Sequence, residues 1–118
     1  MTTKKTGAAG ESAVAQWLTD HGFFVLEKNY RTREGEVDLI AQKDDLIVFV
    51  EVKTRKKRHF CLSQVIVPKK QKRLILAAKQ YIFNQQYIDK AFRFDVALVE
   101  EGKDYTIEYI PNAFYSGE

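Results

Sequence analysis

The chain has 118 residues, enough to bury a hydrophobic core, so we expect a single domain over residues 1–118. Its 45% hydrophobic and 30% charged residues are typical of a globular protein, and the longest apolar run, Leu46 to Val50, is too short to cross a bilayer. Cys61 is the one cysteine, which excludes an internal disulfide or a thiolate metal cluster. With the polar start of the chain, it predicts a cytoplasmic protein without membrane contact.

The first half of the chain predicts a helix followed by three strands. Residues 1–6 are expected to form a disordered tail, and apolar residues recur at helical spacing from Gly7 to about Asp20. Phe23 to Tyr30 begins with aromatic and β-branched residues, which predicts the first strand. The polar stretch 42–45 separates two further apolar runs, so strands two and three are predicted to form an antiparallel hairpin.

The second half predicts a helix followed by two strands. The segment from Thr54 to Val67 is expected to be a basic loop, and Pro68 is suited to the first position of a long helix. Phe92 to Glu100 and Tyr105 to Ile110 predict the fourth and fifth strands. The order of the elements predicts an α/β fold in which helices cover a mixed five-stranded sheet.

The predicted hairpin carries charged residues inside otherwise apolar strands. Glu51 and Lys53 must share a face, because side chains of a strand alternate with period two. If Ala41 pairs with Leu46, Asp38 becomes the diagonal neighbour of Glu51 on that face, with Cα atoms about 7–8 Å apart. Like charges this close are destabilising, so the acidic pair calls for a compensating cation. Carboxylate oxygens favour Mg²⁺ or Mn²⁺ over zinc, and the hairpin therefore predicts a site for one of these ions.

Such an ion would suit phosphate chemistry. A metal held by Asp38 and Glu51 activates a water and stabilises the charge that builds on a scissile phosphate, and Lys53 would add a fixed positive donor. Glu11 is a further acid, which the residues alone assign to the first turn of the first helix, where it interacts with the helix dipole.

Two basic clusters follow the acidic hairpin, although the net charge is only +3. Five of the six residues 53–58 and four of the five residues 69–73 are lysine or arginine. A basic run is often no more than a solvated surface, but two runs beside an acidic site favour a polyanion partner. In the second cluster, a bound phosphate would offset the unfavourable positive charge at a helix N-terminus; the alternative is that the side chains splay into solvent. The predicted contacts to nucleic acid are Arg55, Lys56, Lys57, Lys69, Lys70 and Lys72.

Several short motifs together resemble a known family. They are Gly10-Glu11 with Ala15, Asn29-Tyr30-Arg31, Gly35 to Ile40, Phe49 to Arg55, Arg93 to Val96, and Asn112-Ala113-Phe114. On these residues the chain resembles the YraN-like family, also called UPF0102, within the PD-(D/E)xK nuclease-like superfamily that includes archaeal Holliday-junction resolvases. The likeness covers nearly the whole chain.

The resemblance implies a restriction-endonuclease-like core and a set of site residues. Asp38, Glu51 and Lys53 match the catalytic triad of the superfamily, and Glu11 matches the acid that the resolvases carry in their first helix. Gln71 falls where some members carry a polar residue facing the substrate. By contrast, the resemblance gives Asp95 a structural role, paired with a basic neighbour. Because junction resolvases act as symmetric dimers, a homodimer is also implied, for which the sequence identifies no interface.

Three interpretations follow. The first is a metal-dependent endonuclease that hydrolyses phosphodiesters in DNA, with branched or flapped structures as candidate substrates. The second is a non-catalytic nucleic-acid-binding protein that retains the nuclease fold. The third is a purely structural network of Asp38, Glu51 and Lys53, which is disfavoured because buried ion pairs stabilise little. Retention of Lys53 beside two acids favours the first interpretation, since binding alone does not need it.

Overall fold

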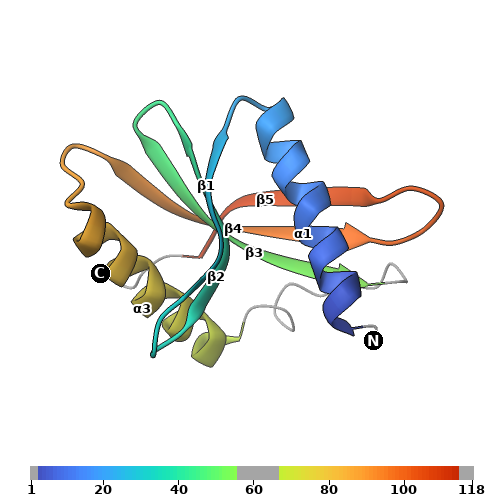
Figure 1. Cartoon of the computed structure of the whole chain (residues 1–118), viewed down its shortest axis with the longest axis horizontal. Helices are drawn as coiled ribbons and strands as arrows, with labels where there is room; N and C mark the ends of the chain where they lie inside the picture. Colours follow the sequence, from blue (N-terminus) through green and yellow to red (C-terminus); the bar gives the residue numbers. More distant parts are fainter. Residues whose placement is uncertain (1–2, 56–66, 115–118) are drawn as a thin grey trace.

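The computed structural model of the chain describes residues 3–55 and 67–114, and in these residues two helices pack on a five-stranded sheet (Figure 1). In chain order the elements are α1 (Thr3–Asp20), β1 (Phe24–Arg31), β2 (Glu36–Lys43), β3 (Leu46–Arg55), α3 (Pro68–Gln85), β4 (Ala91–Glu100) and β5 (Thr106–Phe114). The order α-β-β-β-α-β-β and the mixed sheet confirm the predicted fold class.

The strands lie in the sheet in the same order as in the chain, from β1 to β5. Neighbouring strands are antiparallel except β3 and β4, which pair in parallel over their whole length. Parallel neighbours require a crossover connection, and α3 lies in the chain between these two strands. The parallel pair therefore joins a three-stranded meander to the β4–β5 hairpin.

The two helices cover opposite faces of the sheet and bury separate cores (Figure 1). On the α3 face, the helix contributes a stripe of buried apolar residues at helical spacing: Leu74, Ala77, Ala78 and Tyr81. On the other face, α1 packs Val14 and Leu18 against the sheet. The central strands are apolar on both sides because each of their faces is covered by a helix.

The turn between β2 and β3 is tighter than the sequence suggested. Ala41 pairs with Val48 and Lys43 with Leu46, so the predicted pairing of Ala41 with Leu46 is wrong by two residues. The loop is reduced to Asp44 and Asp45, and Asp44 adopts a positive φ of 53°, a conformation that two-residue hairpin turns favour. A slip of two residues leaves every side chain on its predicted face, whereas a slip of one would have reversed them.

Two predicted boundaries also differ from the structure. Helix α1 begins at Thr3, so the expected tail over residues 1–6 is wrong from Thr3 onward. Strand β3 continues to Arg55, because β4 pairs with it residue for residue up to that point; the predicted loop therefore begins later than Thr54. The rest of that loop, up to residue 66, lies outside the described residues.

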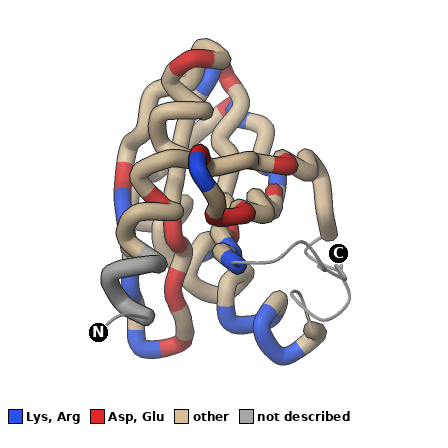
Figure 2. The backbone as a smooth tube through the Cα atoms, turned by 90° about the vertical axis from the view of Figure 1, so that its right-hand side faces the viewer, with Lys and Arg blue, Asp and Glu red and all other residues tan. Residues whose placement is uncertain are grey.

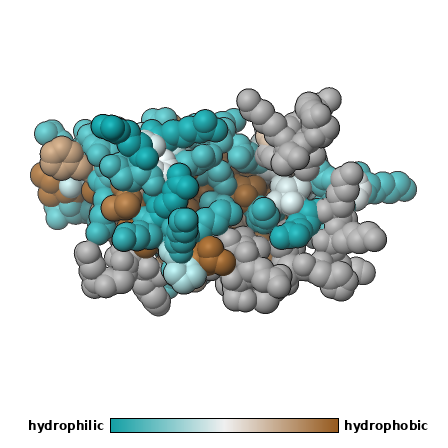
Figure 3. Space-filling view, turned by 90° about the horizontal axis from the view of Figure 1, so that it is seen from below, coloured by the Kyte–Doolittle hydropathy of each residue, from teal (hydrophilic) through white to brown (hydrophobic). Residues whose placement is uncertain are grey.

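Viewed from below, the described surface is mainly hydrophilic, with isolated hydrophobic side chains between the polar ones (Figure 3). The helices turn apolar stripes toward the sheet, and Leu76 and Phe83 of α3 are among the hydrophobic side chains that stay exposed. Neither of the described helices is long and apolar enough to cross a membrane.

A buried carboxylate ties β4 to β5. The side chain of Asp95 is fully buried, and the Nε and Nη2 atoms of Arg93 each donate a hydrogen bond of 2.9 Å to it. The Tyr109 hydroxyl and the Asn112 backbone N–H donate to the same carboxylate. This hydrogen bonding raises the pKa of Arg93, and burial beside the carboxylate raises the pKa of Tyr109. The predicted pairing of Asp95 with a basic neighbour is confirmed.

Replacing Asp95 with asparagine should therefore destabilise the fold. The change leaves the Arg93 guanidinium without its charge partner, which we expect to lower the free energy of unfolding by about 2–4 kcal/mol. Urea unfolding measures this, with Asp104→Asn in the exposed β4–β5 turn as the matched control. Equal midpoints for the two variants would show that the carboxylate charge is not needed.

Candidate active site

Asp38 and Glu51, the two acids that the hairpin predicts to hold a metal, line one cavity at the end of the sheet where α3 begins, whereas Glu11 is not among its lining residues. The cavity has a volume of about 260 Å³. Its lining residues are Glu36, Asp38, Glu51, Lys70, Arg73 and Leu74. The structure therefore brings Asp38 and Glu51 together, as predicted, and adds two cations from α3.

Asp38 lies where β2 and β3 separate. The last backbone pair between these strands is Leu39 with Val50. One residue beyond Glu51, the backbone N–H of Val52 donates instead to the Oδ2 atom of Asp38, at 2.8 Å. The carboxylate thus replaces the strand partner that Val52 has lost, which fixes one oxygen of Asp38 and leaves Oδ1 for a cation.

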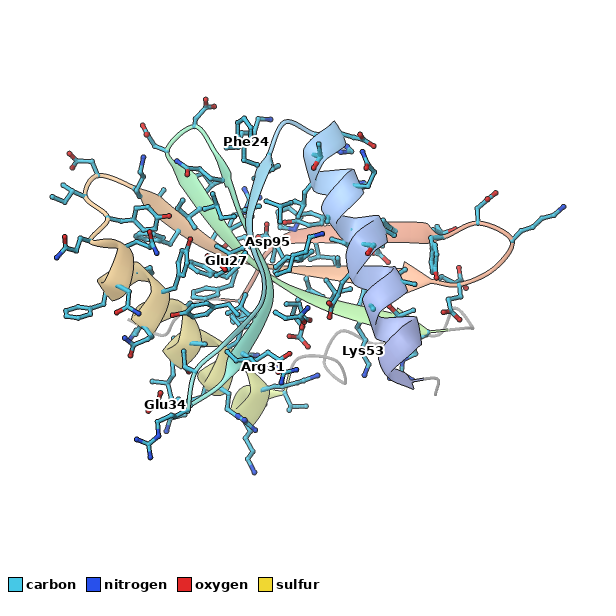
Figure 4. All side chains as sticks on the ribbon, in the orientation of Figure 1. Phe24, Glu27, Arg31, Glu34, Lys53 and Asp95 are labelled. Atoms are coloured by element: carbon cyan, nitrogen blue, oxygen red, sulfur yellow. The ribbon has the colours of Figure 1, made fainter. Side chains whose placement is uncertain are left out.

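Glu51 is held by a lysine, but not by the one that the sequence suggested. The Nζ atom of Lys70 lies 3.1 Å from Glu51 Oε2, and the Glu51 side chain is only 13% exposed. Lys53, labelled in Figure 4, belongs to the same face of β3 as Glu51, because this strand pairs regularly with β4. The charge of Lys53 lowers the pKa of Glu51 less than the charge of Lys70 does. Lys53 is not among the residues that line the cavity.

The acids of the site are less acidic than usual. Burial, followed by the charge of Glu51, raises the pKa of Asp38 to about 8, against the opposing hydrogen bond from Val52. Burial also raises the pKa of Glu51, although Lys70 counteracts it. These shifts have the cause expected for neighbouring carboxylates in a low-dielectric site, and a bound cation would reverse them.

Glu11 approaches this site from α1. It lies in the third turn of the helix, because α1 starts at Thr3, so the predicted interaction with the helix dipole at the first turn is wrong. Burial is the main cause of its raised pKa, and the charges of Glu36 and Glu51 add to it. A hydrogen bond with Asn29, whose φ is 54°, opposes this rise. Glu11 therefore shares the electrostatic environment of the cavity.

Two glycines allow the close packing that builds the site. A Cβ atom at Gly10 would overlap the Thr54 hydroxyl, so glycine lets α1 lie against β3 beside Glu11. A Cβ at Gly35 would overlap the backbone carbonyl oxygen of Arg73. The Arg73 Nε atom also donates to the Glu34 carbonyl at 3.3 Å, which clamps the start of β2 to α3.

Sequence reasoning missed Glu36 and Arg73 as lining residues. Arg73 follows Lys70 by three residues, a spacing that puts both side chains on one face of a helix. This spacing within the second basic cluster indicates that Arg73 accompanies Lys70 in any site that Lys70 lines. Glu36 precedes Asp38 by two residues but is exposed, and its carboxylate lies 3.5 Å from the Nε atom of Arg31.

The remaining predicted basic residues surround the first turn of α3. Lys69 and Lys72 are exposed there, Gln71 is half-buried beside them, and Arg55 lies at the end of β3. Lys56 and Lys57 lie outside the described residues. The first turn of α3 has basic but no acidic residues (Figure 2). Val67 provides no side-chain cap for this helix. The suggestion that these side chains only splay into solvent is wrong for Lys70, which contacts Glu51.

The donor atoms fit a hard divalent cation. Mg²⁺ is usually bound by one or two carboxylates together with water and phosphate oxygens. The cavity offers the sheltered carboxylates of Asp38 and Glu51, and beside them the more exposed carboxylate of Glu36. Within residues 3–55 and 67–114, no group of three histidine, cysteine or acidic side chains is arranged to hold a metal. Glu11 is therefore close to the acidic pair without completing a preformed three-ligand set.

Comparison with known structures identifies the class of fold. The chain resembles the structure of Hjc, a Holliday junction resolvase from Archaeoglobus fulgidus, with a TM-score of 0.54 and 15% sequence identity. The match covers 89% of this chain and 76% of the resolvase. The fold is thus the restriction-endonuclease-like fold that the sequence resemblance implied.

Sequence comparison identifies the family. Residues 10–99 match the family described as "Uncharacterised protein family UPF0102". A UPF0102 protein of Alkaliphilus metalliredigens is 43% identical over 95% of this chain and 99% of its own length. One from Dictyoglomus turgidum is 41% identical over 97% and 100%. The chain belongs to the UPF0102 family, as its motifs indicated.

The raised pKa of Asp38 predicts a pH-dependent effect of the change Asp38→Asn. An acid whose pKa is higher in the folded protein stabilises the fold at low pH and costs stability as the pH rises from about 4, its unfolded value, to about 8. Asparagine can still accept from Val52 but cannot ionise. In EDTA, we expect the variant to gain about 1–3 kcal/mol over the wild type between pH 5 and pH 9. Urea unfolding at both pH values tests this, and an unchanged difference would contradict it.

Proposed function

We propose that the protein is a metal-dependent nuclease that hydrolyses phosphodiester bonds in DNA. The observation that carries the proposal is the cavity in which the buried Asp38 and the partly buried Glu51 lie with Lys70 and Arg73. The sugar-phosphate backbone of DNA brings its own negative charge to a site of this kind, so its binding beside the two acids needs both a divalent cation and fixed positive side chains. The likeness to a Holliday junction resolvase supports branched or flapped DNA as the substrate class.

Each residue has a proposed task. Asp38 Oδ1 and the Glu51 carboxylate would hold Mg²⁺ or Mn²⁺, which supplies Lewis-acid stabilisation of the phosphate and a water of lowered pKa. Lys53 would stabilise the charge that develops on the scissile phosphate. The charges of Glu36 and Glu51 act on Glu11. With a cation present, Glu11 would join Asp38 and Glu51 as a third ligand, either directly or through a bound water.

The basic residues would hold the DNA outside the cavity. Lys69, Gln71 and Lys72 lie in the first turn of α3, next to Lys70, and Arg55 ends β3. Phosphate contacts from such residues are independent of sequence and position the duplex. We extend this role to Lys56 and Lys57 from the sequence pattern. A four-way junction would suit a homodimer with two such sites, and a DNA substrate accords with a cytoplasmic location.

The proposal predicts metal binding and cleavage that depend on the acids. Wild-type protein with Mn²⁺ should cut at least one member of a panel of linear, flapped, single-stranded and four-way DNA. Glu51→Gln should lower the cleavage rate at least ~100-fold and weaken Mn²⁺ binding measured by calorimetry. Lys53→Met should lower the rate while changing Mn²⁺ affinity little, because the ion-pair partner of Glu51 is Lys70, and Lys53 acts on Glu51 more weakly.

The matched control is Glu108→Gln, a change of the same chemistry at an exposed position on β5. It should leave both cleavage and Mn²⁺ affinity as in the wild type. Intact DNA in every sample, with no Mn²⁺ binding by the wild type, would overturn the proposal.

The second candidate is a non-catalytic nucleic-acid-binding protein. Its supporting observation is the Lys70–Glu51 ion pair, which balances the charge of one acid without a metal. Salt-dependent binding of the same DNA panel, unchanged by Mn²⁺ and without cleavage, would favour this function.

A further inference from the structure

We propose that Lys70 is a displaceable cation: it neutralises Glu51 until a divalent metal binds, and then turns to a phosphate of the DNA. The inference rests on the proposed function and adds to it that Lys70 exchanges between two partners, the Glu51 carboxylate and a DNA phosphate. Lys70 would compete with the metal and assist the substrate, two roles with opposite consequences when the lysine is removed.

The ion pair places Lys70 on an atom that the metal needs. Its Nζ atom lies 3.1 Å from Glu51 Oε2, and both residues line the cavity with Asp38. A dication bound between the two carboxylates would repel an ammonium group at this distance, so the ion pair and the metal compete for Glu51.

The lysine can leave without disturbing the fold. Its side chain is 46% exposed and carries four flexible methylene groups, so it reaches solvent by rotation alone. The neighbouring cation of the cavity is different, because the Arg73 Nε atom is hydrogen-bonded to the Glu34 carbonyl and its backbone lies against Gly35. Arg73 is thus part of the framework, and Lys70 is the cation that can move.

A phosphate near the start of α3 would receive the displaced lysine. Pro68 occupies the beginning of the helix, and the Gln71 N–H already donates to the Val67 carbonyl, at 3.0 Å. The N–H groups of Lys69 and Lys70 belong to the first turn, where a helix has no internal acceptors for them. A phosphate that approached the cavity from this side would meet these N–H groups together with the Lys70 ammonium.

The test is to remove the charge of Lys70 and measure Mn²⁺ and DNA separately. Lys70→Met keeps most of the side-chain volume but frees Glu51. At pH 8 and without DNA, calorimetry should show Mn²⁺ bound about tenfold more tightly than by the wild type, as expected for loss of one competing ion pair. With Mn²⁺ present, the same variant should bind its DNA substrate several-fold more weakly and cleave it at least about tenfold more slowly.

Two matched variants separate this role from a general effect of charge. Lys69→Met removes a neighbouring exposed lysine of the same turn, and should weaken DNA binding without changing Mn²⁺ affinity. Lys70→Arg retains an ion pair with Glu51 and should keep Mn²⁺ affinity near that of the wild type. Circular dichroism confirms that each variant is folded.

The possible failures are distinguishable. If the wild type binds Mn²⁺ and Lys70→Met binds it equally or less tightly, the displaceable-cation role is overturned and the proposed nuclease function stands. If neither protein binds Mn²⁺, both proposals are overturned.

Discussion

The site depends on one hydrogen bond, from the backbone N–H of Val52 to the carboxylate of Asp38. At this point β2 and β3 stop pairing, and a side chain replaces the missing backbone acceptor. The replacement places a carboxylate inside the protein, one strand away from Glu51, whose side chain is partly buried. The raised pKa values of both acids follow from this arrangement, as does the recruitment of Lys70 from α3. The fold thus holds two carboxylates that repel each other side by side, and a divalent cation bound between them would offset this repulsion.

The elements around the acidic pair are held together by close contacts at two glycines. Gly35 lets the start of β2 touch α3 at Arg73, and Gly10 lets α1 touch β3 at Thr54. These contacts bring the first turns of α3 and the third turn of α1 to the same end of the sheet. The remote Asp95 network serves a different purpose, since it fixes β4 to β5 on the α1 face and contributes nothing to the cavity.

Much of this arrangement could be predicted from the sequence, because strand periodicity is robust. Asp38 and Glu51 share a face even though the predicted register was two residues away from the observed one. The register of β2 with β3 depends on a turn in which Asp44 adopts a left-handed conformation. An aspartate in the sequence does not by itself predict that conformation. The choice of Lys70 over Lys53 as the partner of Glu51 could not be predicted, because it depends on where a crossover helix starts in space. The position of Glu11 required the true start of α1, which its polar first residues concealed.

We propose that Asp38 and Glu51 form a site for a divalent cation, and that Lys70 neutralises Glu51 while the cation is absent. A crystal structure of the protein soaked in Mn²⁺, with anomalous diffraction recorded at the manganese edge, tests it most directly. We expect an anomalous peak from a manganese ion that contacts the carboxylates of both Asp38 and Glu51, with the Lys70 Nζ atom moved away from Glu51. The absence of a peak at saturating Mn²⁺, with the Lys70–Glu51 ion pair still in place, would contradict it.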